Sequence, residues 1–119
     1  MEPFDSLLLK EAKQFTFFFN RTQTHIFYRD ILYLEAGEHC TYIHTKEMVY
    51  KYSCALSAVS KEFVEDSHFL FCGKSFFLNL DWVKEIHWNE NQIIMENTDV
   101  IFIPKRIAKV FCENIKSVQ

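Results

Sequence analysis

The chain has 119 residues, of which 49% are hydrophobic and 24% charged, and its formal net charge is −3. That length fits one domain with its own core, and the charged fraction together with the hydrophobic content excludes a disordered chain. No stretch reaches the ~18 uncharged apolar residues of a membrane span, and the N-terminus lacks the basic start and apolar core of a signal peptide. We therefore expect a cytoplasmic protein that does not contact membranes.

The composition favours β structure. Phe, Tyr and Trp make up 17% of the chain, whereas there are only two Gly and two Pro, and aromatic residues prefer half-buried strands. The four cysteines form no CxxC pair and none is spaced from a histidine as in a zinc finger. We predict reduced thiols that act as small hydrophobic residues, and we expect neither a metal nor a cofactor.

The first half of the chain is predicted to consist of strands. Residues 1–13 are interpreted as a short leader and residues 14–119 as the folded domain. Apolar residues alternate with polar ones or form short β-prone runs, with turn-forming residues between them. The pattern predicts strands at 15–19, 24–28, 30–36, 40–44 and 48–52, and turns at 20–23, 37–39 and 45–47.

The second half combines strands with two helices. Leu56, Val59, Ser60, Phe63 and Val64 share one helix face, and Ser53 or Ser57 is available as its cap. Residues 69–80 are predicted to form two strands around Gly73-Lys74-Ser75, and further strands are predicted at 83–88, 92–95 and 100–103. Pro104 opens an amphipathic helix whose apolar side is predicted to hold Ile107, Val110, Phe111, Ile115 and Val118.

Charge is segregated along the chain. Residues 81–100 carry a net charge of −4, whereas residues 103–119 carry +3 and present Lys105, Lys109 and Lys116 on one side of the predicted helix. About eight to ten short strands in close succession, with one central and one C-terminal helix, predict antiparallel sheets rather than βαβ units. The total charge therefore conceals a local basic surface.

The motifs that could carry catalysis are weak. Gly73-Lys74-Ser75 resembles the end of a phosphate-binding loop, but the required Gly five positions earlier is replaced by His68. No Ser, His and Asp or Cys and His can be assigned to a catalytic pair. We expect no catalytic residues and no enzyme, and a small-molecule enzyme is the least favoured alternative.

Two motifs, the stretch from Asp30 to Ala36 and the run from Lys74 to Asn79, resemble signatures of the LytTR family of bacterial DNA-binding domains. Asp30-Ile31-Leu32-Tyr33-Leu34-Glu35-Ala36 is similar to the opening signature of that family, and Lys74-Ser75-Phe76-Phe77-Leu78-Asn79 resembles its Arg-Ser-Tyr-Leu-Val-Asn run. Val83 to Ile86 and Ile101 to Lys109 fit the following strands and the basic start of the terminal helix. The resemblance covers about residues 14–118.

The resemblance implies an elongated, mainly β domain of about ten short strands in stacked antiparallel sheets. It also implies a transcriptional regulator, commonly the output half of a two-component response regulator, whose loops enter successive major grooves of promoter DNA. Family members commonly pair on direct repeats, so a dimer on DNA and a sensor or receiver encoded nearby are expected partners. The matched positions that could contact DNA are His39, Lys74 and Lys105, with Ser75, Arg106 and Lys109 beside phosphates.

Two stretches depart from the family pattern. The usual Arg-x-His-Arg-Ser is replaced by Phe71-Cys72-Gly73-Lys74-Ser75, and the usual Ser-Arg by Pro104-Lys105. Because Lys lacks the planar fork of Arg, we expect weaker direct readout of guanine. A LytTR-like module that binds protein instead of DNA therefore stays open as an alternative. We expect no receiver domain, because no N-terminal segment has room for one; this leaves a stand-alone regulator, slightly favoured by Met1, or an excised output domain.

Overall fold

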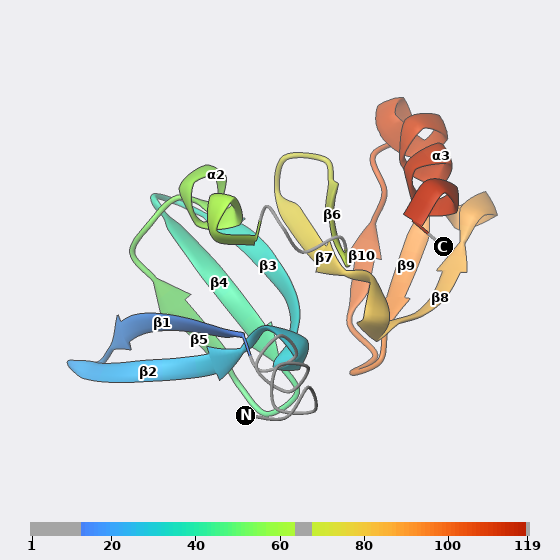
Figure 1. Cartoon of the computed structure of the whole chain (residues 1–119). Coiled ribbons are helices and arrows are strands. Elements are labelled where there is room, and N and C mark those ends of the chain that lie inside the picture. Colours follow the sequence, from blue (N-terminus) through green and yellow to red (C-terminus); the bar gives the residue numbers. More distant parts are fainter. Residues whose placement is uncertain (1–12, 64–67, 119) are drawn as a thin grey trace, which may run out of the picture.

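The computed structural model describes residues 13–63 and 68–118, and within them ten strands form three antiparallel sheets (Figure 1). The predicted leader, apart from Lys13, and the predicted helix end at 65–67 lie outside these residues. The strands are β1 (Gln14–Phe19), β2 (Thr22–Phe27), β3 (Ile31–Gly37), β4 (Cys40–Thr45), β5 (Val49–Tyr52), β6 (Phe69–Cys72), β7 (Phe76–Asn79), β8 (Val83–His87), β9 (Gln92–Met95) and β10 (Val100–Phe102); the helices are α2 (Leu56–Val59) and α3 (Ala108–Val118).

The three sheets follow one another along the longest dimension of the molecule, which measures 47 Å against 24 Å for the shortest. β1 and β2 form a hairpin, the central sheet has the order β5-β4-β3-β7-β6, and the third sheet has the order β10-β9-β8. All described pairings are antiparallel. The predicted fold class is therefore confirmed.

Strand β3 is buried on both faces, which explains its nearly continuous apolar run. Ile31 and Leu34 contribute to a first core, and Leu32 and Tyr33 to a second one. The register against β4 shifts between Ile31 and Tyr33, as expected where a β-bulge inserts one residue and turns neighbouring side chains to different faces. One strand thus joins the two cores of the domain.

The first core lies between the β1–β2 hairpin, the central sheet and α2. It is rich in aromatic rings that meet edge to face or stacked, as aromatic pairs prefer; its buried members include Phe15, Phe17, Phe63, Phe69 and Phe77. The second core lies between the central sheet, the third sheet and α3, and includes Ile93, Met95, Ile101, Phe111 and Ile115. The burial of these apolar side chains is the main term that stabilises both halves.

Four local predictions need correction. The first turn is Asn20-Arg21 alone, because both residues take positive φ (51° and 62°) and close a two-residue hairpin. The central helix divides into α2 and a 3-10 segment, Ser60–Phe63, and its N-cap is Ala55 rather than Ser53 or Ser57. Val110, predicted on the apolar side of α3, is 57% exposed, because the core contacts only the narrower face that holds Phe111 and Ile115.

All four cysteines are free thiols, with Cys40 and Cys72 buried. None of the helices within residues 13–63 and 68–118 is long and apolar enough to cross a membrane.

Candidate nucleic-acid interface

Three turns lie at the same edge of the molecule, at the top of Figure 1. They are the β3–β4 turn with Glu38 and His39, the β6–β7 turn with Gly73, Lys74 and Ser75, and the segment from Pro104 to Lys109, in which a 3-10 turn at Lys105–Ile107 leads into α3. We call residues 38–39, 73–75 and 104–109 the three-turn edge. All six residues predicted to contact DNA belong to it.

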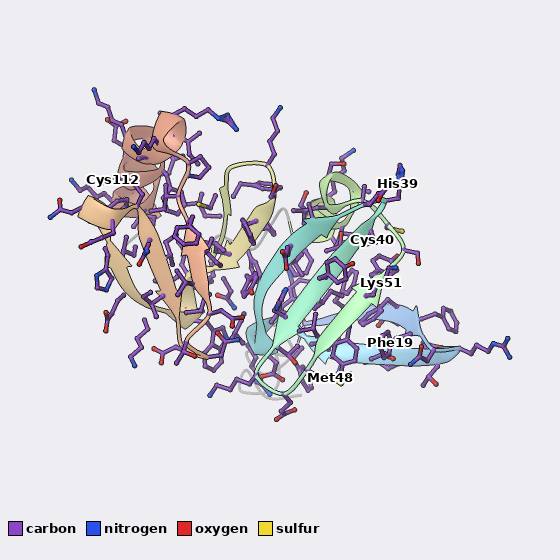
Figure 2. The ribbon with its side chains drawn as sticks, turned by 180° about the vertical axis from the view of Figure 1, so that it is seen from behind. Phe19, His39, Cys40, Met48, Lys51 and Cys112 are labelled. Carbon is purple, nitrogen blue, oxygen red and sulfur yellow. The ribbon has the colours of Figure 1, made fainter. Side chains whose placement is uncertain are left out.

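The first two turns are fixed side by side by the backbone. The amide of Ala36, at the end of β3, donates to the carbonyl oxygen of Ser75 at 2.7 Å. The pairing of Gly37 with Cys40 leaves a two-residue turn in which His39 has φ 58°. Histidine is among the residues that tolerate this left-handed conformation. Figure 2 shows His39 at the outer end of the β3–β4 hairpin.

The second and third turns also contact each other. Gly73 has φ 72°, and a Cβ at this position would lie 3.4 Å from Cγ of Pro104 and 3.9 Å from Cδ1 of Ile107. Glycine supplies the positive φ, and the side chains of Pro104 and Ile107 lie within van der Waals reach of this position. The β6–β7 turn therefore packs against the start of the C-terminal segment. Lys74 follows Gly73 and Lys105 follows Pro104, so the two lysines lie beside this contact.

The two departures from the family pattern are explained in part by this contact. Gly73 and Pro104 stand where the family usually has polar residues, and here their atoms pack together. The exchange of polar groups for an apolar contact removes two hydrogen-bonding side chains from the edge, while Lys74 and Lys105 on either side remain exposed.

The cations of the three-turn edge are available to a ligand. The side chains of the six predicted residues are exposed; they are His39, Lys74, Ser75, Lys105, Arg106 and Lys109. Within residues 13–63 and 68–118, every ion pair uses a histidine as its basic partner, and none involves Lys74, Lys105, Arg106 or Lys109. Four permanent positive charges thus line one edge without a carboxylate partner in the described part of the chain.

The contacts that assemble this edge were not predicted from the sequence. The Ala36–Ser75 hydrogen bond and the Gly73–Pro104 contact join residues that are more than 30 positions apart. A long-range pairing of this kind leaves no local pattern, so only the order of the motifs in the family resemblance pointed to it.

Comparisons with known proteins identify the family and the fold of this chain. The LytTr DNA-binding domain family matches residues 22–116. Proteins named "Transcriptional regulatory protein YpdB" from Escherichia coli K12 and Shigella flexneri are 32% identical over 83 residues, which is 68% of this chain and 34% of theirs. The match thus spans about a third of the length of these relatives.

A solved structure shows the same fold. The LytTr DNA-binding domain of a response regulator from Bacillus cereus superposes with a TM-score of 0.74 and 19% sequence identity, over 86% of this chain and 95% of that one. The order of motifs, the three sheets and the family match lead to one assignment. The chain belongs to the LytTR family of DNA-binding domains.

Proposed function

We propose that this chain is a sequence-specific DNA-binding domain of a transcriptional regulator, and that it contacts promoter DNA through the three-turn edge. His39, Lys74 and Lys105 are the proposed contacts to base edges or phosphates, and Ser75, Arg106 and Lys109 the proposed phosphate neighbours. The three turns follow one another along the long dimension of the molecule, which suits loops that enter successive major grooves. Pairs of copies on direct repeats fit the same arrangement.

One observation supports this proposal above the others. A chain with a net charge of −3 still places four unpaired Lys and Arg side chains on a single edge of its described part. Cationic side chains that neutralise phosphates supply most of the affinity for duplex DNA and make it dependent on salt. The ion pairs that carboxylates of residues 81–100 make within the described residues all go to histidines, which leaves these four cations available for local attraction despite the negative total.

A salt titration tests the proposal. Duplexes selected by the chain from a random-sequence pool serve as the probe, and affinity is measured by fluorescence anisotropy at several salt concentrations. Lys74→Ala and Lys105→Ala should each lower the log–log salt slope by about 0.9 if the side chain neutralises one phosphate. If a lysine instead reads a base, its variant should relax discrimination at one position of the site.

Lys84→Ala is the matched control, since Lys84 is an exposed lysine on β8 with no described ion pair. It should leave the slope unchanged. Binding that is absent, insensitive to salt, or equally affected by Lys84→Ala contradicts the proposal.

The alternative function, a module that binds protein, is favoured by a different surface. Phe102 is 63% and Val100 47% exposed on β10, the edge strand of the third sheet. An exposed apolar strand of this kind is a typical site of protein contact. If the chain is folded and monomeric but selects no duplex from the random-sequence pool, this alternative is favoured.

A further inference from the structure

We infer that a cavity beside the β4–β5 turn binds a small organic cation with an aromatic body, a second ligand that the proposed function does not include. The cavity has a volume of about 320 Å³, at the lower end of the range for small-molecule sites. Figure 2 shows Met48, in the β4–β5 turn, and His39, in the three-turn edge, at opposite ends of β4. A ligand in the cavity therefore leaves the proposed contacts with DNA free.

Three separate parts of the chain form the walls of this cavity. The first is the end of β2 with the 3-10 turn that follows it, the second is the β4–β5 turn with Tyr50, and the third is Trp82, which directly precedes β8. The indole Nε1 of Trp82 donates to the carbonyl oxygen of Arg29 at 2.5 Å. This hydrogen bond fixes the Trp82 ring against the 3-10 turn, so this part of the wall is formed before a ligand binds.

Aromatic rings supply much of the lining. Phe27, Tyr50 and Trp82 all line the cavity and are half-buried. Two of these rings already hold a cation of the chain itself, since Nζ of Lys46 lies 4.4 Å from the ring centroid of Trp82 and Cζ of Arg29 lies 4.7 Å from that of Phe27. The negative face of an aromatic ring attracts cations. The walls therefore have the chemistry that holds an ammonium group.

The charged groups of the lining favour a cation over an anion. Asp30 and Glu47 line the cavity with exposed carboxylates, and neither makes an ion pair within residues 13–63 and 68–118. Lys46 is the single lysine or arginine among the described lining residues. With His25 neutral, the two carboxylates therefore leave the lining with one negative charge in excess.

A ligand that suits both features carries a positive charge on a flat apolar body. Its ammonium group would face the carboxylates, and its ring would pack on the aromatic walls. An aromatic acid of the same size would be repelled by the carboxylates, and an uncharged analogue would lose the attraction to them. For a ligand of about eight non-hydrogen atoms we expect a dissociation constant of about 1 mM.

A titration of the isotope-labelled full chain with benzylamine, which is protonated near neutral pH, tests this site. Amide chemical shifts should change at Asp30, Lys46 and Glu47. The indole N–H signal of Trp82 should move, whereas that of Trp88, the second tryptophan of the chain, should stay in place. Benzyl alcohol, which has the same shape without the charge, should bind up to about fivefold more weakly, and benzoate more weakly still.

Three substitutions and a control identify the groups that hold the probe. Lys46→Met removes the ammonium group from the face of Trp82 but keeps an apolar stem, so benzylamine should bind about two- to fivefold more tightly. Asp30→Asn and Glu47→Gln should each weaken its binding by up to about fivefold. Lys61→Met makes the same change at an exposed lysine that does not line the cavity, and should leave the affinity unchanged.

Several results would overturn the site. They are the absence of any shift with benzylamine at about 10 mM, ten times the expected dissociation constant, equal binding of benzylamine and benzoate, shifts centred away from the cavity, and weaker binding by Lys46→Met. The gain expected from Lys46→Met cannot arise from a misfolded variant. None of these results touches the proposed function, which is tested with DNA duplexes alone.

Discussion

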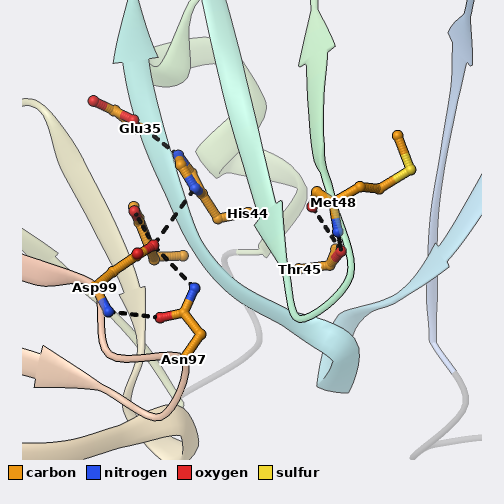
Figure 3. Close-up of polar contacts among 7 residues, drawn as sticks. Glu35, His44, Thr45, Met48, Asn97 and Asp99 are labelled. Carbon is orange, nitrogen blue, oxygen red and sulfur yellow. Dashed lines mark hydrogen bonds and ion pairs between the residues drawn. The ribbon is translucent and has the colours of Figure 1, made fainter.

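The ring of Tyr33 lies parallel to the imidazole of His44, with 4.0 Å between centroids and 12° between planes. The hydroxyl group of Tyr33 donates to Oδ2 of Asp99 at 2.8 Å. His44 itself lies between Glu35, 2.8 Å from its Nε2, and Asp99, 3.9 Å from its Nδ1 (Figure 3). These contacts fasten the β9–β10 turn to the central sheet, and so join the half that carries Lys74 to the half that carries Lys105.

Tyr33→Phe tests whether the hydrogen bond to Asp99 stabilises the contact between the β9–β10 turn and the central sheet. The substitution keeps the stacked ring but removes a hydrogen bond to a carboxylate, so the free energy of unfolding should fall by about 1–2 kcal/mol. Urea denaturation followed by circular dichroism measures the change. Tyr50→Phe is the control, since the Tyr50 hydroxyl makes no hydrogen bond within the described residues; it should change the free energy by less than about 0.5 kcal/mol. Equal effects of the two variants would contradict a stabilising role of the hydrogen bond between Tyr33 and Asp99.

Gly73→Ala tests the packing of two turns of the edge. Alanine at φ 72° should cost about 1–2 kcal/mol of stability, although its Cβ would meet Cγ of Pro104 at an ordinary contact distance of 3.4 Å. Relief of the strained φ would shift the turn that carries Lys74, so affinity for a selected duplex should fall as well. Ser75→Ala is an alanine substitution in the same turn without a positive φ, and its free energy of unfolding should match that of the unmodified chain. A Gly73→Ala variant of unchanged stability would show that the turn is not constrained as described.

Cys72 should make stability depend on alkaline pH. Burial raises the pKa of this thiol from 9.0 to about 11, because the apolar second core disfavours the thiolate. Between pH 9 and about 11 the unfolded chain loses this proton and the folded chain keeps it, so the free energy of unfolding falls as pH rises through that window. Below pH 9 the thiol keeps its proton in both the folded and the unfolded chain, so its full contribution to the free energy of unfolding is present.

Urea denaturation at pH 8 and pH 10 measures this effect. Cys72→Ala should have a lower free energy of unfolding than the unmodified chain at both pH values. Between pH 8 and pH 10, however, its free energy of unfolding should fall by less than that of the unmodified chain. Cys112→Ala, which changes a partly exposed thiol on α3, should keep the decrease of the unmodified chain. A Cys72→Ala variant with the full decrease would contradict the assignment. Tyr33, whose pKa is raised by burial and by Asp99, should add a further loss of stability above about pH 10.

Local sequence patterns predicted most of the strands, but not the conformation of the turns and helix ends that connect them. The alternation of Phe15, Phe17 and Phe19 was sufficient for β1, since side chains of a strand alternate between its faces. The two-residue turn at Asn20-Arg21 was missed, because it lacks the Gly that usually marks such turns. The spacing of Leu56, Val59 and Phe63 fits both an α-helix and a 3-10 helix, so it could not show where one ends and the other begins.

The residues of the candidate site were predicted, and the contacts that hold them together were not. His39, Lys74 and Lys105 were singled out as positions that match the LytTR family, and whether they touch DNA stays a prediction. Their common edge depends on the hydrogen bond between Ala36 and Ser75 and on the contact between Gly73 and Pro104. These are tertiary contacts, which periodicity and spacing cannot specify.

The most direct test of the interface is a titration of isotope-labelled chain with a duplex that carries one selected site, followed by amide chemical shifts. We expect changes at Glu38, His39, Gly73, Lys74, Ser75 and the amides from Lys105 to Lys109, while Lys84 to His87 on β8 keep their shifts. Changes centred on β8 or on the β1–β2 hairpin, with the three-turn edge unaffected, would contradict the proposed mode of DNA binding.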